Sequence, residues 1–495
     1  MAGVGFGLKK MFRGRGVLAV LRGYSVAAVV TEGPMVLMIL LLLALQRLLE
    51  GFGTVYRLRE QFLFFMTYAM IFSLLLAGIV LLFLDRFISD CIYQQRLQDV
   101  LPAFFGMVFF LLLAGAPAMG LYLLTLPVSW AVRLAVQLLF CTLLVIWVQM
   151  SCLSTVKRYT FLLLGFAAGA GAALLLTWAF LAGGMDPLPA ALWGMALGFL
   201  VLLFLYMVQL LQCYPAGGWN LLVFFPALQR YPDLLLTGLL LGLGLYGHNF
   251  VFWASGYRGQ VFPTGVYCAR YDVPAFFATL TILPMLVQFV VGLETRFAAK
   301  HRAYFDTILY GGRLEDIRAA KQEMETVLYA EFSHMLQMQL IVAIASVAFL
   351  GNFLQTVGLD ETMAGTFRVL CFGYCLYGVV KCGTVLLLYF DDRAGACRAA
   401  GLFAALSLAG SLVTLALGPD TWGAGFLAAG AVTGFWVLRR LRRYLDGLEY
   451  HVFCEQPLFA QPQKGVLCRA EETLARADRT FAQRRHPRET NREQD

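Results

Sequence analysis

Twelve long apolar stretches constrain this chain more than any other feature of its sequence. One of them, residues 192–211, reads LWGMALGFLVLLFLYMVQLL and contains no charged residue. About 20 such residues cross the roughly 30 Å of a bilayer core as a helix. A membrane β-barrel is excluded, because its strands alternate apolar and polar residues. A soluble globular protein is also excluded, because 60% of the 495 residues are hydrophobic and only 14% are charged, whereas soluble domains carry about 25% charge.

The apolar stretches predict an all-α polytopic membrane protein with twelve transmembrane helices. Basic residues and an apolar run at the start resemble a signal peptide, but the run is too long and lacks a small-residue cleavage site, so we interpret it as the first span. The predicted spans cover residues 24–45, 62–84, 103–124, 134–156, 161–181, 192–211, 234–253, 275–293, 335–354, 369–390, 399–417 and 422–438.

The distribution of basic residues predicts which side of the membrane each loop faces. An even number of spans places both chain ends on one side, and loops rich in Lys and Arg stay in the cytoplasm. Five basic residues precede the first span, four arginines at 439–443 follow the last, and six lie in the loop after span eight. The loops after spans five and eleven contain none, although Arg47, Arg57 and Arg59 lie on the opposite side. We therefore expect a multi-pass protein of the cytoplasmic (inner) membrane with both termini cytoplasmic.

Proline and glycine residues divide the chain into two halves. Five of them lie between Cys213 and Asp233, where they disfavour a continuous helix. We predict two six-helix lobes, residues 1–214 and 234–444, with a connector at 215–233. The charged composition from residue 445 predicts a cytosolic tail at 445–495. After a turn at Gly311 and Gly312, the long loop behind span eight should form an amphipathic cytosolic helix at about 314–331.

Two charged residues lie deep inside predicted spans, where a charge costs about 2.5–3.5 kcal/mol on insertion scales. Glu32 precedes Gly33 and Pro34 in the first span, and Pro34 removes a backbone donor, so a bend is expected there. The Glu32 carboxylate either meets a cation, a proton or a cationic sugar in a cavity, or is structural and bonded to a neighbouring span. Lys381, in span ten, either contacts substrate or pairs with an acid or carbonyl of a neighbouring helix.

Span seven contains polar and aromatic residues close together. His248 and Asn249 precede a cluster of rings that ends at Trp253. Such rings either stack on sugars or form a belt at the membrane interface. The candidate cavity residues are therefore Glu32, Pro34, His248, Asn249, Trp253 and Lys381.

The sequence lacks the patterns that are typical of catalysis and of metal or nucleotide binding. The five histidines have no HExxH spacing, no CxxC pair occurs, and no GxxxxGK[ST] loop is present. We predict no metal, no cofactor and no enzymatic activity. The net charge of +8 fits sidedness and attraction to an anionic lipid bilayer, and we predict no binding to nucleic acid.

Three segments together resemble the PelG family, the Pel exopolysaccharide transporters of the multidrug/oligosaccharidyl-lipid/polysaccharide (MOP) flippase superfamily. They are Met1–Phe6 with Leu8, Lys9 and Lys10; Ser89, Asp90, Tyr93, Asp99, Leu101–Phe104 and Gly106; and Glu294, Thr295, Phe297, Tyr304, Ile308, Gly311, Gly312, Leu314, Ile317, Lys321 and Met324. The resemblance covers about residues 1–455. It implies two lobes around a central cavity and the passage of a nascent, partly deacetylated amino-sugar polymer across the cytoplasmic membrane.

The resemblance also implies partners, namely a cytosolic PelF-like glycosyltransferase and PelD-like and PelE-like membrane proteins. The sequence departs from the family in two places. The family commonly has Ser-Gly-Pro where this chain has Glu32-Gly33-Pro34, and Asp-Lys where this chain has His248-Asn249. The substrate or the coupling ion could differ accordingly.

Four functions fit the sequence: a polysaccharide exporter, a flippase of the same superfamily for a lipid-linked oligosaccharide or small molecule, a membrane glycosyltransferase or acyltransferase, and a non-transporting scaffold for a glycosyltransferase. We favour the exporter. The amphipathic helix at 314–331 bears on this choice, because its apolar stripe is too large to face water. Either the glycosyltransferase docks on the stripe or the protein packs against it. The docking candidates are Leu314, Ile317, Met324 and Leu328.

Overall fold

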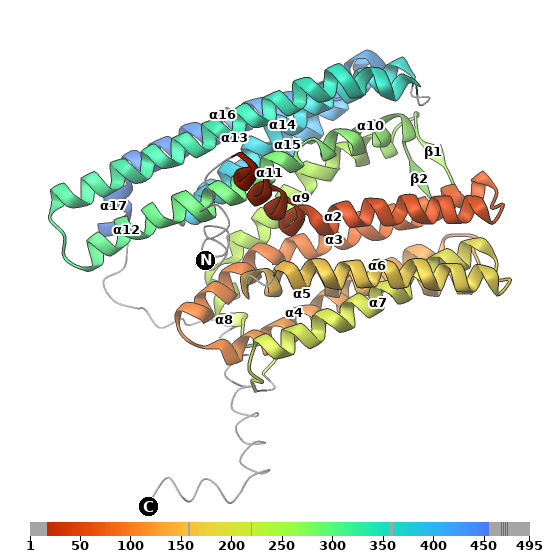
Figure 1. The fold of residues 1–495 in the computed structure, drawn as a ribbon, viewed down its shortest axis with the longest axis horizontal. Coiled ribbons are helices and arrows are strands. Elements are labelled where there is room, and N and C mark those ends of the chain that lie inside the picture. Colours follow the sequence, from red (N-terminus) through yellow and green to blue (C-terminus); the bar gives the residue numbers. More distant parts are fainter. Residues whose placement is uncertain are drawn as a thin grey trace, which may run out of the picture.

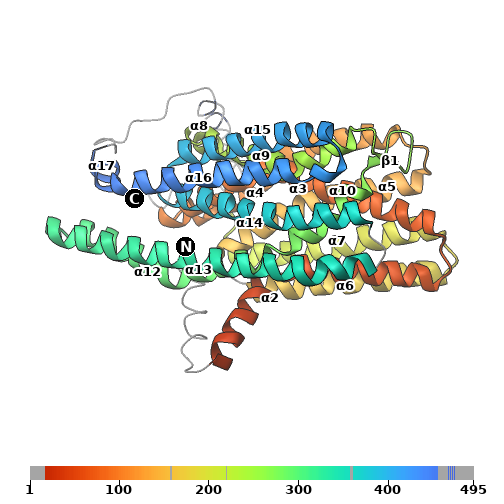
Figure 2. The ribbon, with the colours of Figure 1, turned by 90° about the horizontal axis from the view of Figure 1, so that it is seen from above.

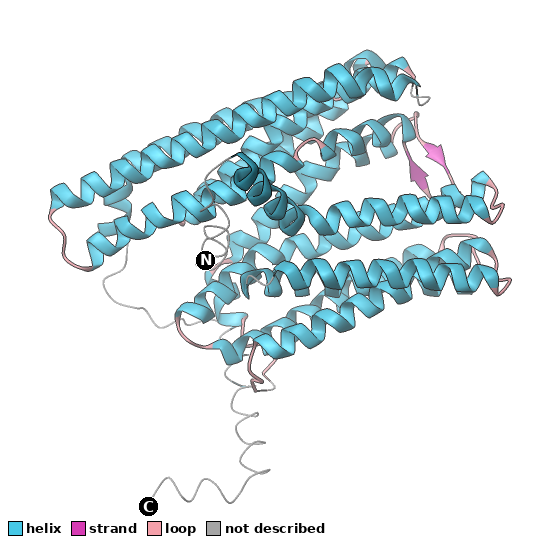
Figure 3. Ribbon diagram, viewed as in Figure 1, coloured by secondary structure: helices cyan, strands magenta, loops and turns pink. Residues whose placement is uncertain are grey.

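The computed structural model describes residues 17–156, 159–218, 220–356 and 360–454, and residues 467, 469, 471 and 473. This part of the chain is helical apart from short loops and one two-stranded hairpin (Figure 3). It contains twelve helices long and apolar enough to cross a membrane. The predicted all-α fold with twelve spans is therefore confirmed. The first six spans, red to yellow in Figure 1, form one lobe, and the last six, green to blue, form the other.

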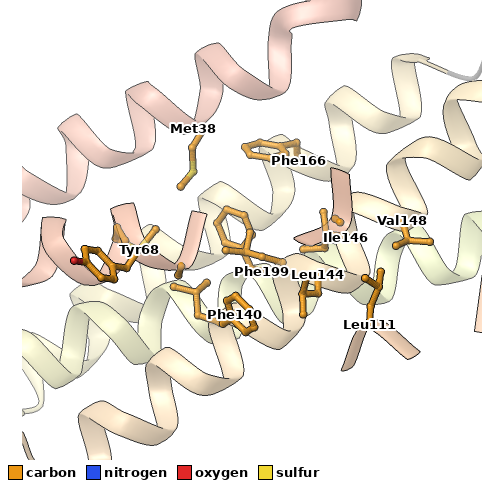
Figure 4. Packing of buried hydrophobic residues seen from close by; sticks show 14 of the residues in the cluster. Met38, Tyr68, Leu111, Phe140, Leu144, Ile146, Val148, Phe166 and Phe199 are labelled. Atoms are coloured by element: carbon orange, nitrogen blue, oxygen red, sulfur yellow. The ribbon is translucent and has the colours of Figure 1, made fainter. Parts of the chain in front are cut away.

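The N-terminal lobe is built around side chains that its helices turn toward one another. Figure 4 shows these apolar side chains meeting, and the rings of Phe166 and Phe199 lie edge to face with centroids 5.8 Å apart. Side chains on the outer faces, such as Leu113 and Phe204, are exposed, as expected for helices that face lipid. The helices are α2 (Val17–Gly51), α3 (Tyr56–Tyr93), a 3₁₀ turn (Leu97–Asp99), α4 (Val100–Leu124), α5 (Trp130–Val156), α6 (Tyr159–Ala182) and α7 (Pro187–Cys213).

The C-terminal lobe differs in that its second span is interrupted. That span consists of α10 and α11 and then continues through a π-helical turn into α12. The elements are α9 (Pro232–Trp253), α10 (Ala269–Leu280), α11 (Leu283–Gly292), the π-helical turn (Leu293–Phe297), α12 (Ala298–Leu309), α13 (Leu314–Thr356), α14 (Glu361–Tyr389), α15 (Arg393–Leu417), a 3₁₀ turn (Pro419–Thr421), α16 (Ala424–Asp446) and α17 (Leu448–Phe453).

Helix α13 joins two elements that we predicted separately. The amphipathic helix at 314–331 and the span at 335–354 form one helix of 43 residues. The physical reason is that no glycine or proline occurs between Leu314 and Leu350, so nothing ends the helix between the two segments. The predicted turn at Gly311 is present, and Gly311 has a φ of +73°, which glycine adopts without steric cost.

The two ends of the bundle carry different structures. At one end lie the segment between α7 and α9, with its short helix α8 (Phe225–Arg230), and the projecting α12–α13 pair (Figures 1 and 2). We name this the connector end. At the other end, strands β1 (Gly259–Gln260) and β2 (Val266–Tyr267) pair antiparallel between α9 and α10. We name this the hairpin end.

The lobes meet along α3 and α9, which pack against each other, and also where α2 packs against α11. The helices approach closely at Gly238, where a Cβ atom would lie 2.2 Å from the carbonyl oxygen of Gly78. A Cβ atom on Gly78 would meet no other group within 4 Å. The two backbones are therefore in contact here, and of these two glycines only Gly238 needs to be glycine for steric reasons.

Gly238→Ala is expected to destabilise the protein by about 1–3 kcal/mol, because the added methyl group forces α9 away from α3. Gly78→Ala is the matched control, and it should leave stability unchanged or slightly raised, because alanine favours helix. Thermal denaturation of the detergent-purified proteins measures both. Equal midpoints for the two variants would contradict the backbone contact.

Candidate functional site

The junction between the lobes is the candidate site, because the sequence analysis predicts a transporter whose substrate passes between two lobes. At the hairpin end the junction is aromatic. The ring of Tyr68 on α3 stacks on Trp253 of α9, with centroids 5.1 Å apart and planes inclined by 4°. Tyr122 of α4 stacks on Tyr68 at 5.6 Å. Phe64 of α3 meets Phe262 of the hairpin loop at 5.6 Å. We name these five residues the aromatic junction.

Hydrogen bonds join the hairpin to the N-terminal lobe beside these rings. The Tyr68 hydroxyl donates to the Val266 carbonyl at 2.6 Å. The hydroxyl groups of Thr125 and Thr264 are 3.0 Å apart. The Tyr267 hydroxyl donates to Glu60, and burial together with this acidic partner raises the pKa of Tyr267. The Tyr267 hydroxyl therefore stays protonated as a donor, and the hairpin closes this end of the junction.

Asp272, in the first turn of α10, holds the hairpin on the C-terminal lobe. Its carboxylate accepts hydrogen bonds from Asn249 Nδ2 at 2.8 Å, Trp253 Nε1 at 2.8 Å and the Cys268 amide at 2.9 Å. Burial and the charge of Asp272 raise the pKa of the Cys268 thiol to about 11, so this cysteine is a poor nucleophile at neutral pH. Asp272 thus fixes the end of α9 and the start of α10 as one unit.

At the connector end the junction consists of charged residues around Tyr231. The guanidinium groups of Arg86, Arg230 and Arg393 lie 5.3, 5.2 and 4.9 Å from the Tyr231 ring centroid. The Tyr231 hydroxyl donates to Asp90 at 3.1 Å. Burial and the Asp90 charge raise the pKa of Tyr231, which keeps this donor protonated.

Ion pairs extend this network to both lobes. Arg86 of α3 pairs with Asp391, which follows α14, at 3.4 Å, and Arg393 of α15 pairs with Asp233 of α9 at 3.4 Å. These side chains are about one-third to one-half exposed, so each pair contributes at most about 1 kcal/mol. The connector end is therefore closed by several weak interactions in a hydrated setting.

The candidate cavity residues of α9 point to different surroundings. Asn249 and Trp253 belong to the Asp272 network. His248 is fully buried inside the C-terminal lobe, where its Nε2 lies 3.5 Å from the Tyr374 hydroxyl and its ring packs on Phe426. Adjacent positions on a helix point in different directions, so the pair His248-Asn249 is divided between the lobe interior and the hairpin end.

The other candidates lie on α2 and α14, which contribute no residue to the aromatic junction. Helix α2 continues through Pro34 and bends along its length (Figure 2), as a missing backbone donor allows. Glu32 lies in α2, but its side chain is outside the described part of the structure. Lys381 is half-buried in α14 and forms no ion pair with any residue that the structure describes.

Three of the four docking candidates are buried. Ile317, Met324 and Leu328 are 7%, 0% and 3% exposed, in a cluster with residues of α12, α14 and α16. Leu314 is 54% exposed, next to Leu309 and Tyr310 at the tip of the α12–α13 pair. The protein itself thus covers most of the apolar stripe, and only the tip remains accessible.

A polar pocket of about 720 Å³ lies at the connector end, and none of the candidate cavity residues lines it. Glu471 of the tail reaches it and accepts a hydrogen bond from Asn220 at 2.8 Å. Among the described residues, no three His, Cys, Asp or Glu side chains are grouped as metal ligands would be. The lining residues are Phe87, Asp90, Gln94, Arg96, Gln98, Asp99, Pro102, Ala216, Gly217, Gly218, Asn220, Val223, Pro226, Ala227, Arg230, Tyr231 and Glu471.

Sequence reasoning missed Tyr68, Tyr122, Asp272 and Tyr231. Tyr68 and Tyr122 lie in ordinary apolar spans, and no local pattern distinguishes them from lipid-facing rings. Asp272 stands three residues before the predicted start of span eight, where charges are common. One signal was available for Asp272: a single acid at the end of a span needs donors, and Asn249 and Trp253 occur at the same end of the preceding span.

Comparison with known proteins identifies the relatives of this fold. A family model described as "PelG: Putative exopolysaccharide Exporter (EPS-E)" matches residues 1–453. No curated protein matches the chain.

Among solved structures, a MATE transporter in the bent conformation has 13% identity and a TM-score of 0.60, covering 91% of this chain and 99% of that one. A MOP superfamily transporter from Pyrococcus furiosus has 12% identity and a TM-score of 0.60, covering 91% and 99%. An outward-facing multidrug resistance MATE transporter has 13% identity and a TM-score of 0.58, also covering 91% and 99%.

Proposed function

Because the chain belongs to the PelG family of exopolysaccharide exporters, we propose that it moves a nascent amino-sugar exopolysaccharide across the cytoplasmic membrane. The observation that carries the proposal is the extent of the family match, which includes both lobes and the connector and ends only at residue 453. The family and the fold are those of membrane transporters. That the polymer consists of amino sugars is inferred from the resemblance of the sequence to the Pel transporters.

The polymer passes between the two lobes, by alternating access or through a channel-like cavity. The lobes touch at both ends of the α3–α9 contact, through Arg86 and Asp391 at one end and Tyr68 and Trp253 at the other. Passage along this junction requires at least one end to separate. The contacts at the two ends involve side chains, so they can break while every backbone hydrogen bond within the helices stays intact. Each lobe can therefore move as a rigid unit.

A strain lacking this gene should make the polymer but retain it inside the cell, and the wild-type gene should restore extracellular polymer. Assays for amino-sugar polymer in the medium and in the cell fraction measure both. Accumulation of a lipid-linked oligosaccharide instead would favour the flippase alternative. Normal export without the gene would refute transport by this protein.

The connector end faces the cytoplasm, and both termini lie on that side. The support is the number of basic residues there, which includes the arginines at 439–443 and the six residues after span eight. Cysteines at Gly184 and at Gly311 provide a matched pair, because both positions are turn glycines with positive φ and open space around them. A membrane-impermeant maleimide added to intact cells should label Gly184→Cys and not Gly311→Cys. The reverse pattern would invert the proposed topology.

The cytosolic glycosyltransferase docks at the tip of the α12–α13 pair, and the PelD-like and PelE-like proteins complete the assembly in the membrane. The tip supports this because it projects beyond the bundle (Figure 2) and exposes Leu309, Tyr310 and Leu314 by 77%, 87% and 54%. An exposed apolar group of this kind, rimmed by charges, is typical of a protein interface.

Combined Leu309→Asp and Leu314→Asp should release the glycosyltransferase from membranes while the transporter stays inserted. Tyr450→Asp, an exposed position of the same end, is the control and should release nothing. Met324→Asp should instead lower the amount of folded transporter, because it buries an unpaired charge at a cost of several kcal/mol. Immunoblots of membrane and soluble fractions report each outcome. A glycosyltransferase that stays bound to the double variant would place the docking surface elsewhere.

A further inference from the structure

The contact between the lobes changes in character along its length. In its middle, at Gly238 and Gly78, backbone lies on backbone. At the hairpin end, the described contacts between the lobes use side chains; they include the ring stack of Tyr68 on Trp253 and the hydroxyl bonds of Tyr68, Thr125 and Tyr267. Side-chain contacts of this kind can open and close while the helices stay intact. At the hairpin end, the two lobes can therefore separate without unfolding a helix.

We propose that the hairpin between α9 and α10 is a gate, and that the rings of Tyr68 and Trp253, which cover each other in the closed gate, form a subsite on which a sugar ring stacks when the gate opens. This inference rests on the proposed function, because a sugar occupies the subsite only if the chain exports a saccharide. No metal, cofactor or covalent step is involved.

The hairpin moves with the C-terminal lobe. Asp272 accepts three hydrogen bonds, from Asn249, Trp253 and the Cys268 amide, and all three donors belong to that lobe. The links of the hairpin to the N-terminal lobe are ring faces and hydroxyl bonds, namely those of Tyr68 with the Val266 backbone, of Thr264 with Thr125 and of Tyr267 with Glu60. Separation of the lobes therefore breaks the contacts of Tyr68, Thr125 and Glu60 with the hairpin and leaves the Asp272 network whole. Trp253 stays oriented by its bond to Asp272.

The exposed faces fit a saccharide. Tyr68 and Trp253 present flat rings from opposite lobes, and an aromatic face accommodates the C–H groups of a pyranose. If the sugar carries a free amine, its ammonium group is attracted to the same faces by cation–π interaction. The hydroxyls of Thr125 and Thr264 and the carboxylate of Glu60 form other contacts between the hairpin and the N-terminal lobe, and they can bond to sugar hydroxyls when those contacts separate. Two rings with a few polar groups are the usual composition of a ligand site.

A disulfide across the gate tests whether it must open. The variant Thr125→Cys with Thr264→Cys places two thiols where the hydroxyls are 3.0 Å apart, which is close enough for a bond after small rotations. Under oxidising conditions, export should fall at least about tenfold, and a reductant should restore it. The two single-cysteine variants are the controls and should export normally in both conditions. Normal export by the fully cross-linked protein would overturn the gate.

Substitutions of Trp253 test the stacking subsite. Trp253→Leu removes the ring and weakens the closed gate, so a gate without a subsite would export as fast as wild type or faster. The subsite predicts the opposite, a loss of about threefold to tenfold, which is the effect of one aromatic stack. Trp253→Phe keeps a ring and should retain more export than Trp253→Leu, at equal protein levels on immunoblots.

Wild-type export by Trp253→Leu would overturn the subsite. If wild type itself restores no export to the deletion strain, the proposed function has failed, which separates that result from a failure of the gate.

Discussion

The need to hydrogen-bond every backbone group in hydrocarbon is the constraint on which this structure depends. Continuous helices satisfy it internally, so breaks in a span need outside partners. The break between α10 and α11 shows how the chain provides one: the side-chain amide of Gln339, fully buried on α13, donates to the freed Thr281 carbonyl at 3.1 Å. The buried Gln149 of α5 also donates to a backbone carbonyl, that of Leu203 within the unbroken helix α7, at 3.2 Å. Buried polar side chains in this protein thus act mainly on backbone, and this explains why polar residues within spans are poor guides to a transport site.

The same constraint explains why the fold could be predicted from sequence. A chain that crosses a membrane as helix must show each crossing as a long apolar run, and all twelve predicted runs correspond to helices. Helix ends were less predictable, because helices continue into the polar layer wherever no residue stops them. Helix α13 is the clearest case, since charges between Leu314 and Glu331 marked a change of environment but not the end of a helix. The hydropathy of a segment predicts where the chain enters the lipid. The end of a helix is predicted only by glycine, proline and capping residues.

The candidate site was predictable only in part, because its parts are far apart in sequence. Asn249 and Trp253 were recognisable as a polar and aromatic group on one helix, but Asp272, which binds both, lies beyond a hairpin. Tyr68 meets Val266 across 198 positions, and no periodicity within either segment encodes that pairing. His248 illustrates the opposite error of inference: it is adjacent to Asn249, yet it is buried among Tyr271, Tyr374 and Phe426 of its own lobe. Neighbouring residues on a helix share a position along the membrane normal but not a direction.

The two closures of the lobe junction differ in what opposes their opening. At the connector end the ion pair between Arg86 and Asp391, which joins the two lobes, is partly exposed, so water and salt compensate its loss and the cost of separating the lobes there is low. At the hairpin end, Tyr68, Trp253 and Phe262 are buried, and separation exposes apolar surface at about 25 cal/mol per Å². That cost falls when another surface covers the rings. In the proposed subsite, a stacked saccharide is that surface. The arrangement therefore places the closure that hydration can open at the connector end, and the closure that a bound molecule can open at the hairpin end.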